Sequence, residues 1–292
     1  MASAPAPAPE PLSDADLAAI RTHRRFRELV EQRAAVSLAA YHALPLGERW
    51  LTSDLGRTAL AGAVLVLNAW GGLTLGGLLA AKPVQNGLAS PGRVRAFAAQ
   101  ALAYGLIERA GSDEPAGPLT LTTPLAVSAR MRAILAVNLP QVRDPVLALD
   151  PATAPAFAAA DAPAFQDRLT AWMGAMSQAR PDLFEATGRP VHLFQGRDGG
   201  SRMLEALILR QPPDRGRLLQ TCVLSRSELA RAALTSRAHV NGLLADGEAA
   251  GWLALDGKYL TCSPALSDDV ERYYATTFAL TRTGVTSVHA QG

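Results

Sequence analysis

Histidine and cysteine are the residue types of this chain best suited to metal binding or covalent chemistry, and their spacing indicates neither. The five histidines are scattered, with no pair at the helical spacing of metal ligands: His23, His42, His192, His239 and His289. Cys222 and Cys262 lie 40 residues apart, form no metal-binding pattern and require no oxidising compartment. Because no basic neighbour is placed to lower the pKa of either thiol, two buried thiols are favoured over a redox sensor.

Glycine-rich loops that bind phosphate groups are not found in their usual form. The sequence has no G-x-G-x-x-G after a strand, no Walker loop and no G-x-S-x-G elbow. Residues 195–200, QGRDGG, lack the lysine and the glycine spacing of a phosphate-binding loop, so we interpret them as a turn in which Asp198 caps the following helix. We therefore predict no cofactor, no metal and no enzymatic activity.

The composition predicts a folded chain of about two domains. Of its 292 residues 49% are apolar but only 5% are aromatic, and 56 are alanine. We therefore expect a core of closely packed helices, and the composition excludes a disordered chain or a disulfide scaffold. The formal net charge of +2 gives no global attraction to nucleic acid, so such a role depends on where the basic side chains lie.

Two segments bear on localisation. Residues 1–13 alternate proline and alanine and have neither region of a signal peptide, which indicates a disordered tail. Residues 58–81 are uncharged and long enough to span a membrane, but Asn68 and five glycines favour two buried helices joined at Gly71-Gly72. We expect a cytoplasmic protein, with a membrane span as the alternative.

The N-terminal and central regions are predicted to be helices separated by a connector. Asp14 is expected to cap a helix that continues to about Leu44 and carries Arg21, Arg24, Arg25 and Arg27. These arginines are typical of a solvated face, with a phosphate-contacting arm or a dimer seam as alternatives. Residues 143–163 read as a Pro/Ala-rich connector, residues 164–180 as a helix with one apolar face for core or dimer packing, and residues 189–200 as a strand and turn.

Two segments of the chain match each other at an offset of 146 residues. Residues 90–109 read SPGRVRAFAAQALAYGLIER, and residues 236–255 read SRAHVNGLLADGEAAGWLAL. Each is predicted to be a helix that ends near a glycine and continues into a short apolar strand. The matching positions include a valine and that glycine, Val94 with Val240 and Gly105 with Gly251.

Both segments are followed by a further strand and helix. Residues 119–125 (LTLTTPL) and 259–266 (YLTCSPAL) each contain a Thr-Pro or Ser-Pro step that we expect to open a helix, over 125–137 and 266–280. The hairpin before this strand is tight at Asp256-Gly257 in the second copy. In the first copy it is longer and acidic at Asp113 and Glu114, which argues against close phosphate contact there.

Two short helices precede the hairpin of the second copy. Ser225 and Glu228 have the spacing of a capping box for the first of them, and Ser236 or Thr235 is expected to cap the second. So short a turn between two helices predicts a helix-turn-helix. The order helix, strand, hairpin, strand, helix is that of a winged helix.

The second copy resembles the winged-helix transcription regulators of the MarR type found in bacteria. The residues that carry the resemblance are SRSELARAA at 225–233, TSRAHV at 235–240, LLADGEAAGWL at 243–253 and the Asp256-Gly257 turn. The first copy matches less well, because the loop PVQNGLA before Ser90 lengthens its turn. Residues 142–210 and the N-terminal arm show no such resemblance.

The resemblance implies a set of residues that face DNA. In that family the second helix of the motif enters the major groove, and the hairpin approaches phosphate or the minor groove. Carried over to this chain, the contacts with bases fall on the helix that follows the turn, at Ser236, Arg237, His239 and Asn241. Contacts with the backbone fall on Arg226, Arg231 and Lys258, and the first copy offers Ser90, Arg93 and Arg95. The alternative for each of these residues is an ordinary solvated position.

Together these patterns predict a mainly α fold with small β wings, in which two winged helix-turn-helix domains are linked by a helical connector. The expected segments are a tail (1–13), a helical arm that is a candidate for dimerisation (14–50), winged-helix domain 1 (51–142), a linker and connector helix (143–197), winged-helix domain 2 (198–284) and a tail (285–292).

The predicted function is that of a cytoplasmic bacterial transcription regulator, a homodimer that binds double-stranded DNA in a sequence-specific manner. The alternative is a winged-helix module for protein–protein interaction, without DNA readout. An enzyme that uses the winged helix only to dimerise is a further alternative, and a small-molecule effector has no support in the sequence.

Overall fold

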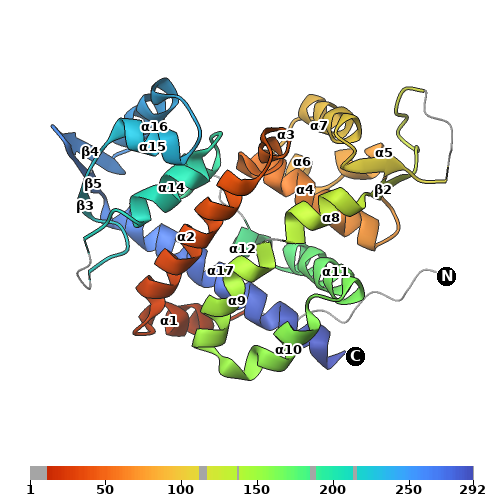
Figure 1. The fold of residues 1–292 in the computed structure, drawn as a ribbon, viewed down its shortest axis with the longest axis horizontal. Coiled ribbons are helices and arrows are strands. Elements are labelled where there is room, and N and C mark those ends of the chain that lie inside the picture. The colour runs from red at the N-terminus through yellow and green to blue at the C-terminus, as the bar shows by residue number, and fades with distance from the viewer. Residues whose placement is uncertain (1–11, 112–116, 137, 185–188, 213–215, 292) are drawn as a thin grey trace.

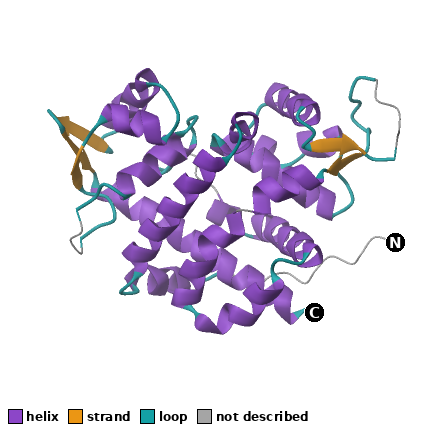
Figure 2. Cartoon of the chain, viewed as in Figure 1, coloured by secondary structure: helices purple, strands orange, loops and turns teal. Residues whose placement is uncertain are grey.

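The computed structural model describes residues 12–111, 117–136, 138–184, 189–212 and 216–291. It is mainly helical with two small antiparallel sheets, which confirms the predicted fold class at that level (Figure 1). The sheets lie at opposite ends of the long axis, and helices fill the space between them (Figure 2).

The elements fall into four consecutive stretches. The N-terminal stretch contains α1 (Asp14–Thr22), α2 (Phe26–Ala43), α3 (Leu46–Arg49) and the 3-10 turn η1 (Trp50–Thr52). The stretch that we name the first unit, residues 54–136, contains α4 (Leu55–Ala69), α5 (Leu75–Leu79), α6 (Lys82–Gln85), α7 (Pro91–Ala103), β1 (Ile107–Arg109), β2 (Leu125–Val127) and α8 (Ala129–Ala136). The central stretch contains α9 (Asn138–Leu149), η2 (Pro151–Thr153), α10 (Ala154–Ala159), α11 (Pro163–Ala179), α12 (Pro181–Phe184) and α13 (His192–Gln195). The second unit, residues 199–290, contains α14 (Gly200–Ile208), β3 (Thr221–Val223), α15 (Arg226–Ala232), α16 (Arg237–Ala249), β4 (Leu253–Asp256), β5 (Tyr259–Cys262) and α17 (Pro264–Ala290).

Two hydrophobic cores stabilise the fold. One is built from residues 51–134 and includes Leu60, Val94 and Met131. The other joins the N-terminal helices, the central helices and the second unit, and includes Leu29 and Phe278. The second unit therefore shares its core with the rest of the chain, whereas the first unit has a core of its own.

The N-terminal helix begins and breaks differently from the prediction. Ser13, not Asp14, is the N-cap, since its hydroxyl accepts a hydrogen bond from the backbone N–H of Asp16 (3.1 Å). The chain then turns after α1, and two helices stand where one was expected. Leu12 is buried, so the predicted tail does not extend to residue 13, and residues 1–11 lie outside the described residues.

The central stretch is more helical than the sequence suggested. Residues 143–163, expected to be a connector, lie largely in α9 and α10, because Val142, Val146 and Phe157 are buried on one side against α2 and α17. The strand expected after residue 189 is wrong. Val191, Leu193 and Phe194 are buried without the alternation of a strand, and a short helix, α13, forms there. The helix predicted over 164–180 is confirmed as α11.

The two units share one order of elements. In each, a helix is followed by an extended segment, a pair of helices, a two-stranded hairpin and a last helix, although α6 adds a turn to the first unit. The extended segment is β3 in the second unit and the single bridge Thr74↔Pro124 in the first. Side-chain hydroxyls cap three helices of each unit at matching places, Thr74 and Ser225, Ser90 and Ser236, Ser128 and Ser263.

The last helix of each unit departs from the prediction. Thr123-Pro124 does not open a helix, because the residues after it pair with β1 as strand β2, and Ser128 is the counterpart of Ser263. Val137, the expected end of this helix, lies outside the described residues. In the second unit α17 continues to Ala290, and Val285 and Val288 are buried. The tail predicted over 285–292 is therefore wrong for residues 285–290, which are helical.

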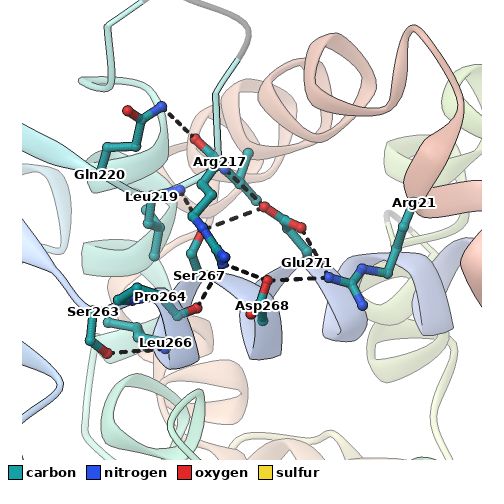
Figure 3. A network of polar contacts seen from close by, with 11 residues as sticks. Arg21, Arg217, Leu219, Gln220, Ser263, Pro264, Leu266, Ser267, Asp268 and Glu271 are labelled. Atoms are coloured by element: carbon teal, nitrogen blue, oxygen red, sulfur yellow. Dashed lines mark hydrogen bonds and ion pairs between the residues drawn. The ribbon is translucent and has the colours of Figure 1, made fainter.

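A polar network fastens the start of α17 to the rest of the second unit and to α1 (Figure 3). Asp268 accepts from Arg217 (2.6 Å), and Glu271 accepts from Arg21 (3.2 Å) and from the backbone N–H of Leu218 (3.0 Å). Ser267 accepts from the backbone N–H of Leu219 (3.0 Å). These contacts hold the segment before β3 against α17. They also pair Arg21 with carboxylates of the same chain.

The uncharged run over 58–81 forms α4 and α5 on either side of Gly71-Gly72, as predicted. Within the part of the chain that the structure describes, no helix combines the length and apolar character needed to cross a membrane.

Candidate nucleic-acid interface

Helices α15 and α16 form a tight two-helix motif with a cap at each start. The hydroxyl of Ser225 accepts from the backbone N–H of Glu228 (3.3 Å), and that of Ser236 accepts from His239 (3.1 Å). Only this half of the predicted capping box is present, because the Glu228 carboxylate binds Arg210 (2.7 Å) instead. Between the helices Leu234 has φ +52°, a left-handed conformation that lets the chain turn within the four residues that separate α15 from α16.

Helix α16 has one buried face and one open face. Val240, Leu243 and Leu244 are buried in the core, and Gly247 lies so close to Leu253 that a Cβ there would overlap it. Gly251, with φ +70°, ends the helix as predicted and directs the chain into β4. Arg237 and Asn241 lie on the open face, where solvent reaches both side chains.

Four exposed basic side chains of α15, α16 and the hairpin have no carboxylate partner within the described part of the chain. They are Arg226 and Arg231 on α15, Arg237 on α16 and Lys258 in the β4–β5 turn, and all four are exposed. Among the described residues none of the four has a carboxylate within 4.0 Å, and the Lys258 ammonium lies 5.5 Å from the centre of the Tyr259 ring. Arginines elsewhere are often held, as Arg130 is by Glu48 (2.7 Å). The motif therefore presents positive charge that is free to meet an anion.

The hairpin lies beside the start of α15. Gly257 and Lys258 connect β4 to β5, and the backbone carbonyl of Lys258 accepts from the backbone N–H of Leu224 (2.7 Å). A positive φ of +57° at Gly257 suits the first central position of a two-residue hairpin turn. The contact with Leu224 places the Lys258 turn near Arg226, two residues further along the chain.

An open groove of about 460 Å³ runs along the motif, lined by Arg226, Asn241, Leu244, Ala245, Glu248 and Leu255. Its walls combine a guanidinium, an amide and a carboxylate. The Glu248 carboxylate accepts from the backbone N–H of Leu255 (3.2 Å), which ties the end of α16 to β4. Sequence reasoning did not select Glu248, because nothing in the pattern distinguishes it from a solvated residue.

Two of the predicted base-contacting residues, Ser236 and His239, are less accessible than the other two. The Ser236 hydroxyl is occupied as the N-cap of α16. His239 is half-buried, and its Nε2 atom is buried without a hydrogen-bond partner among the described residues. Arg237 and Asn241 are therefore better placed than Ser236 and His239 to approach a ligand.

The first unit presents a poorer version of this surface. The Arg93 guanidinium donates to both carboxylate oxygens of Asp54 (2.5 and 2.6 Å), so the prediction that it faces DNA conflicts with this contact. The Ser90 hydroxyl caps α7. Arg95 is exposed, as is Lys82 on the inserted helix α6, a residue that sequence reasoning did not select. Asp113 and Glu114 lie outside the described residues.

Comparison of the chain with models of known families, with curated proteins and with solved structures finds no match.

The two cysteines lie on neighbouring strands of the second unit and are both free. Burial raises the pKa of both thiols, and that of Cys262 reaches about 12, with the nearby Cys222 adding to the shift. Thiols so protonated are poor nucleophiles at neutral pH. Within the described part of the chain, no cluster of three or more His, Cys, Asp or Glu is suited to a metal ion.

Proposed function

We propose that this chain is a transcription regulator that binds double-stranded DNA, with each unit a winged helix-turn-helix of the MarR type. The second unit presents α16 to the major groove, and the β4–β5 turn lies beside the phosphate backbone. The observation that carries the proposal is the set of four exposed basic side chains on α15, α16 and the hairpin that have no carboxylate within 4.0 Å among the residues that the structure describes. A regulator of this kind acts in the cytoplasm of a bacterial cell.

Arg237 and Asn241 supply the sequence readout in this proposal. An arginine can bind guanine with two hydrogen bonds, and an asparagine can do the same with adenine. Arg226, Arg231 and Lys258 supply contacts with phosphate, which position the protein without reading sequence. Because the whole chain is near neutral, binding to DNA in this proposal depends on these few local cations and not on the net charge.

Binding of a fluorescent random-sequence duplex, followed by anisotropy at several salt concentrations, tests the proposal. We expect salt-sensitive binding that weakens at least tenfold in an Arg226→Ala, Arg231→Ala, Lys258→Ala triple variant. Arg143→Ala is the matched control, since it removes a charge that pairs with the adjacent Asp144, outside the motif. Absence of salt-sensitive binding by the wild-type chain would falsify the proposal.

A protein-binding module is the second candidate, and the outer face of the β3–β5–β4 sheet favours it. Val223 and Tyr259 are cross-strand partners there, and they are 55% and 46% exposed. Arg237→Ala with Asn241→Ala separates the two functions, because a regulator would lose sequence preference while a protein-binding module would keep its partner.

The homodimer stays a prediction, and α2 and α11 are the two helices that the sequence offers for its interface. The apolar residues of α2 and α11, such as Leu29, Val30, Trp172 and Met176, are buried in the chain's own core. A dimer built on those faces would require the chain to open.

A further inference from the structure

The two units meet through equivalent segments, which lie at and directly before the start of each unit. Ser53 and Asp54 directly precede α4, the first helix of the first unit, and Asp198 and Gly199 directly precede α14, the first helix of the second. The backbone N–H of Gly199 donates to the carbonyl of Ser53 (2.7 Å), and the Arg57 guanidinium lies 3.3 Å from the Asp198 carboxylate. Asp54 and Gly199 are the N-caps of α4 and α14, and they lie 145 residues apart. The N-caps of α7 and α16, Ser90 and Ser236, lie 146 residues apart, so the two contact segments occupy equivalent places in the repeat.

This contact is connected to α7 on one side. The Asp54 side chain is 7% exposed and accepts from both the Arg93 guanidinium and the backbone N–H of Arg57 (3.0 Å). Arg93 lies in the first turn of α7. The N-terminal end of α7 is therefore held to the point where the two units meet.

The same contact is connected to α16 on the other side. Gly199 packs on the turn before α16, where a Cβ on this glycine would lie 3.0 Å from the carbonyl oxygen of Ala233 and 3.7 Å from the Cβ of Thr235. Ser236, the cap of α16, is the next residue. The N-terminal ends of both helices thus adjoin one small polar contact, and both helices lie along one edge of the molecule with the sheets at its far ends (Figure 1).

Contact between like segments is the signature of a two-fold arrangement, which homodimers obtain with two chains. Here the two like segments belong to one chain. We propose that a single chain is the DNA-binding unit, and that its partner is one duplex with two unequal half-sites. This inference rests on the proposed function and adds the stoichiometry and the form of the DNA site.

The two half-sites are unequal because the two helices carry different side chains. The second unit offers Arg237 and Asn241 together with three further cations, whereas the first unit offers Arg95 on α7 and Lys82 on α6. The first unit therefore contacts the backbone and adds affinity, and the second unit reads sequence.

Native mass spectrometry and footprinting on one selected duplex test the inference. The probe is enriched on the full-length protein from random duplexes of roughly 40 base pairs, long enough for half-sites one or two helical turns apart. We expect one chain per duplex and two protected half-sites. Lys82→Ala with Arg95→Ala should remove protection from one half-site, and Arg237→Ala with Asn241→Ala from the other. Two chains per duplex, or one protected half-site in the wild type, overturns the inference and leaves the proposed function intact, whereas failure to bind any duplex overturns both.

A change at the contact between the units provides a second test. Asp198→Asn removes the ion pair with Arg57, and Asp144→Asn is a matched control at another exposed aspartate. Five base pairs inserted between the half-sites turn them to opposite faces of the duplex, about half a helical turn apart. We expect the wild type and the control to lose at least tenfold in affinity on this insertion, and Asp198→Asn to lose no more than they do, because the hydrogen bond from Gly199 to Ser53 remains. A loss of less than threefold in the wild type contradicts the inference.

Discussion

Arg93 and Asp54 form a two-bonded ion pair that joins the first turn of α7 to the start of α4, 39 residues earlier in the chain. Asp54 also caps α4 through the backbone N–H of Arg57 (3.0 Å). The pair assigns Arg93 to the architecture of the first unit, although its type and position suit a DNA contact equally well.

The first prediction concerns this ion pair. Asp54→Ala should lower the free energy of unfolding by about 2 kcal/mol, since it removes a helix cap as well as the ion pair. Arg93→Ala should lower it by about 1 kcal/mol, because the half-exposed guanidinium is partly screened. Urea unfolding followed by tryptophan fluorescence measures both effects, with Asp144→Ala as the control. An Arg93→Ala protein as stable as the control, but weaker in binding DNA, would return Arg93 to the interface.

The second prediction uses two glycines of α16 that differ in their surroundings. Gly242→Ala should raise the free energy of unfolding by up to about 1 kcal/mol, because a Cβ there meets only the Arg197 guanidinium at 3.4 Å and alanine favours a helix. Gly247→Ala gains the same helix propensity but should lower stability by about 1–3 kcal/mol, since its Cβ would overlap Leu253 and Leu193. Thermal unfolding of the two variants compares them directly, and an equal effect in both would contradict the packing of β4 against α16.

Local signals were sufficient to predict the motif of the second unit. Ser225 and Ser236 are caps, and the hairpin turns at Gly257-Lys258, one residue after the predicted Asp256-Gly257, because Asp256 pairs with Tyr259 at the end of β4. Each of these features depends on residues within a few positions of one another, which is the range at which caps and turns are determined. The repeat then located α7 and β1 from α16 and β4.

Features determined by distant residues could not be predicted in the same way. The partner of Arg93 lies 39 residues away, and residues 143–163 form helices because Val146 and Phe157 find buried positions against α2 and α17. Proline and alanine in that stretch are equally compatible with a connector until those partners are known. The equivalence of Thr123-Pro124 with Ser263-Pro264 failed because the strand lies after the proline in the first unit and before it in the second.

The third prediction concerns the turn between α15 and α16. Leu234 has φ +52°, which costs about 1–2 kcal/mol for a residue with a side chain, and it is 45% exposed, so it contributes little burial. Leu234→Gly should raise the free energy of unfolding by about 0.5–1 kcal/mol after the added chain entropy of glycine is taken into account. Leu234→Val should lower it, because β-branched residues tolerate this conformation least. Chemical unfolding measures the free energy of unfolding of both variants. A glycine variant less stable than the valine variant would contradict the prediction and show that the turn depends on the leucine side chain.

The fourth prediction is a loss of stability at alkaline pH that depends on Cys262. Burial raises the pKa of this thiol from 9.0 to about 12, so between these values the folded chain retains a proton that the unfolded chain releases. The contribution is fully present below pH 9 and is lost as the pH rises toward 12, by at most about 1.4 kcal/mol per pH unit. Cys262→Ala should therefore be less stable than the wild type at pH 7, with a difference that narrows above pH 9. Urea unfolding at several pH values measures this difference. A difference in the free energy of unfolding that stays constant from pH 7 to 11 would contradict the prediction.

The fifth prediction is the salt dependence of DNA binding. Binding through the three phosphate-contacting cations of the second unit, Arg226, Arg231 and Lys258, should give a slope of log affinity against log salt of about −3, because each phosphate neutralised releases just under one counterion. Contacts by Lys82 and Arg95 of the first unit should steepen it to about −4.5. The Lys82→Ala, Arg95→Ala variant should therefore have a shallower slope at unchanged sequence preference, measured by anisotropy between about 50 and 200 mM salt. A slope that these substitutions leave unchanged, with preference altered instead, would mean that α7 reads bases.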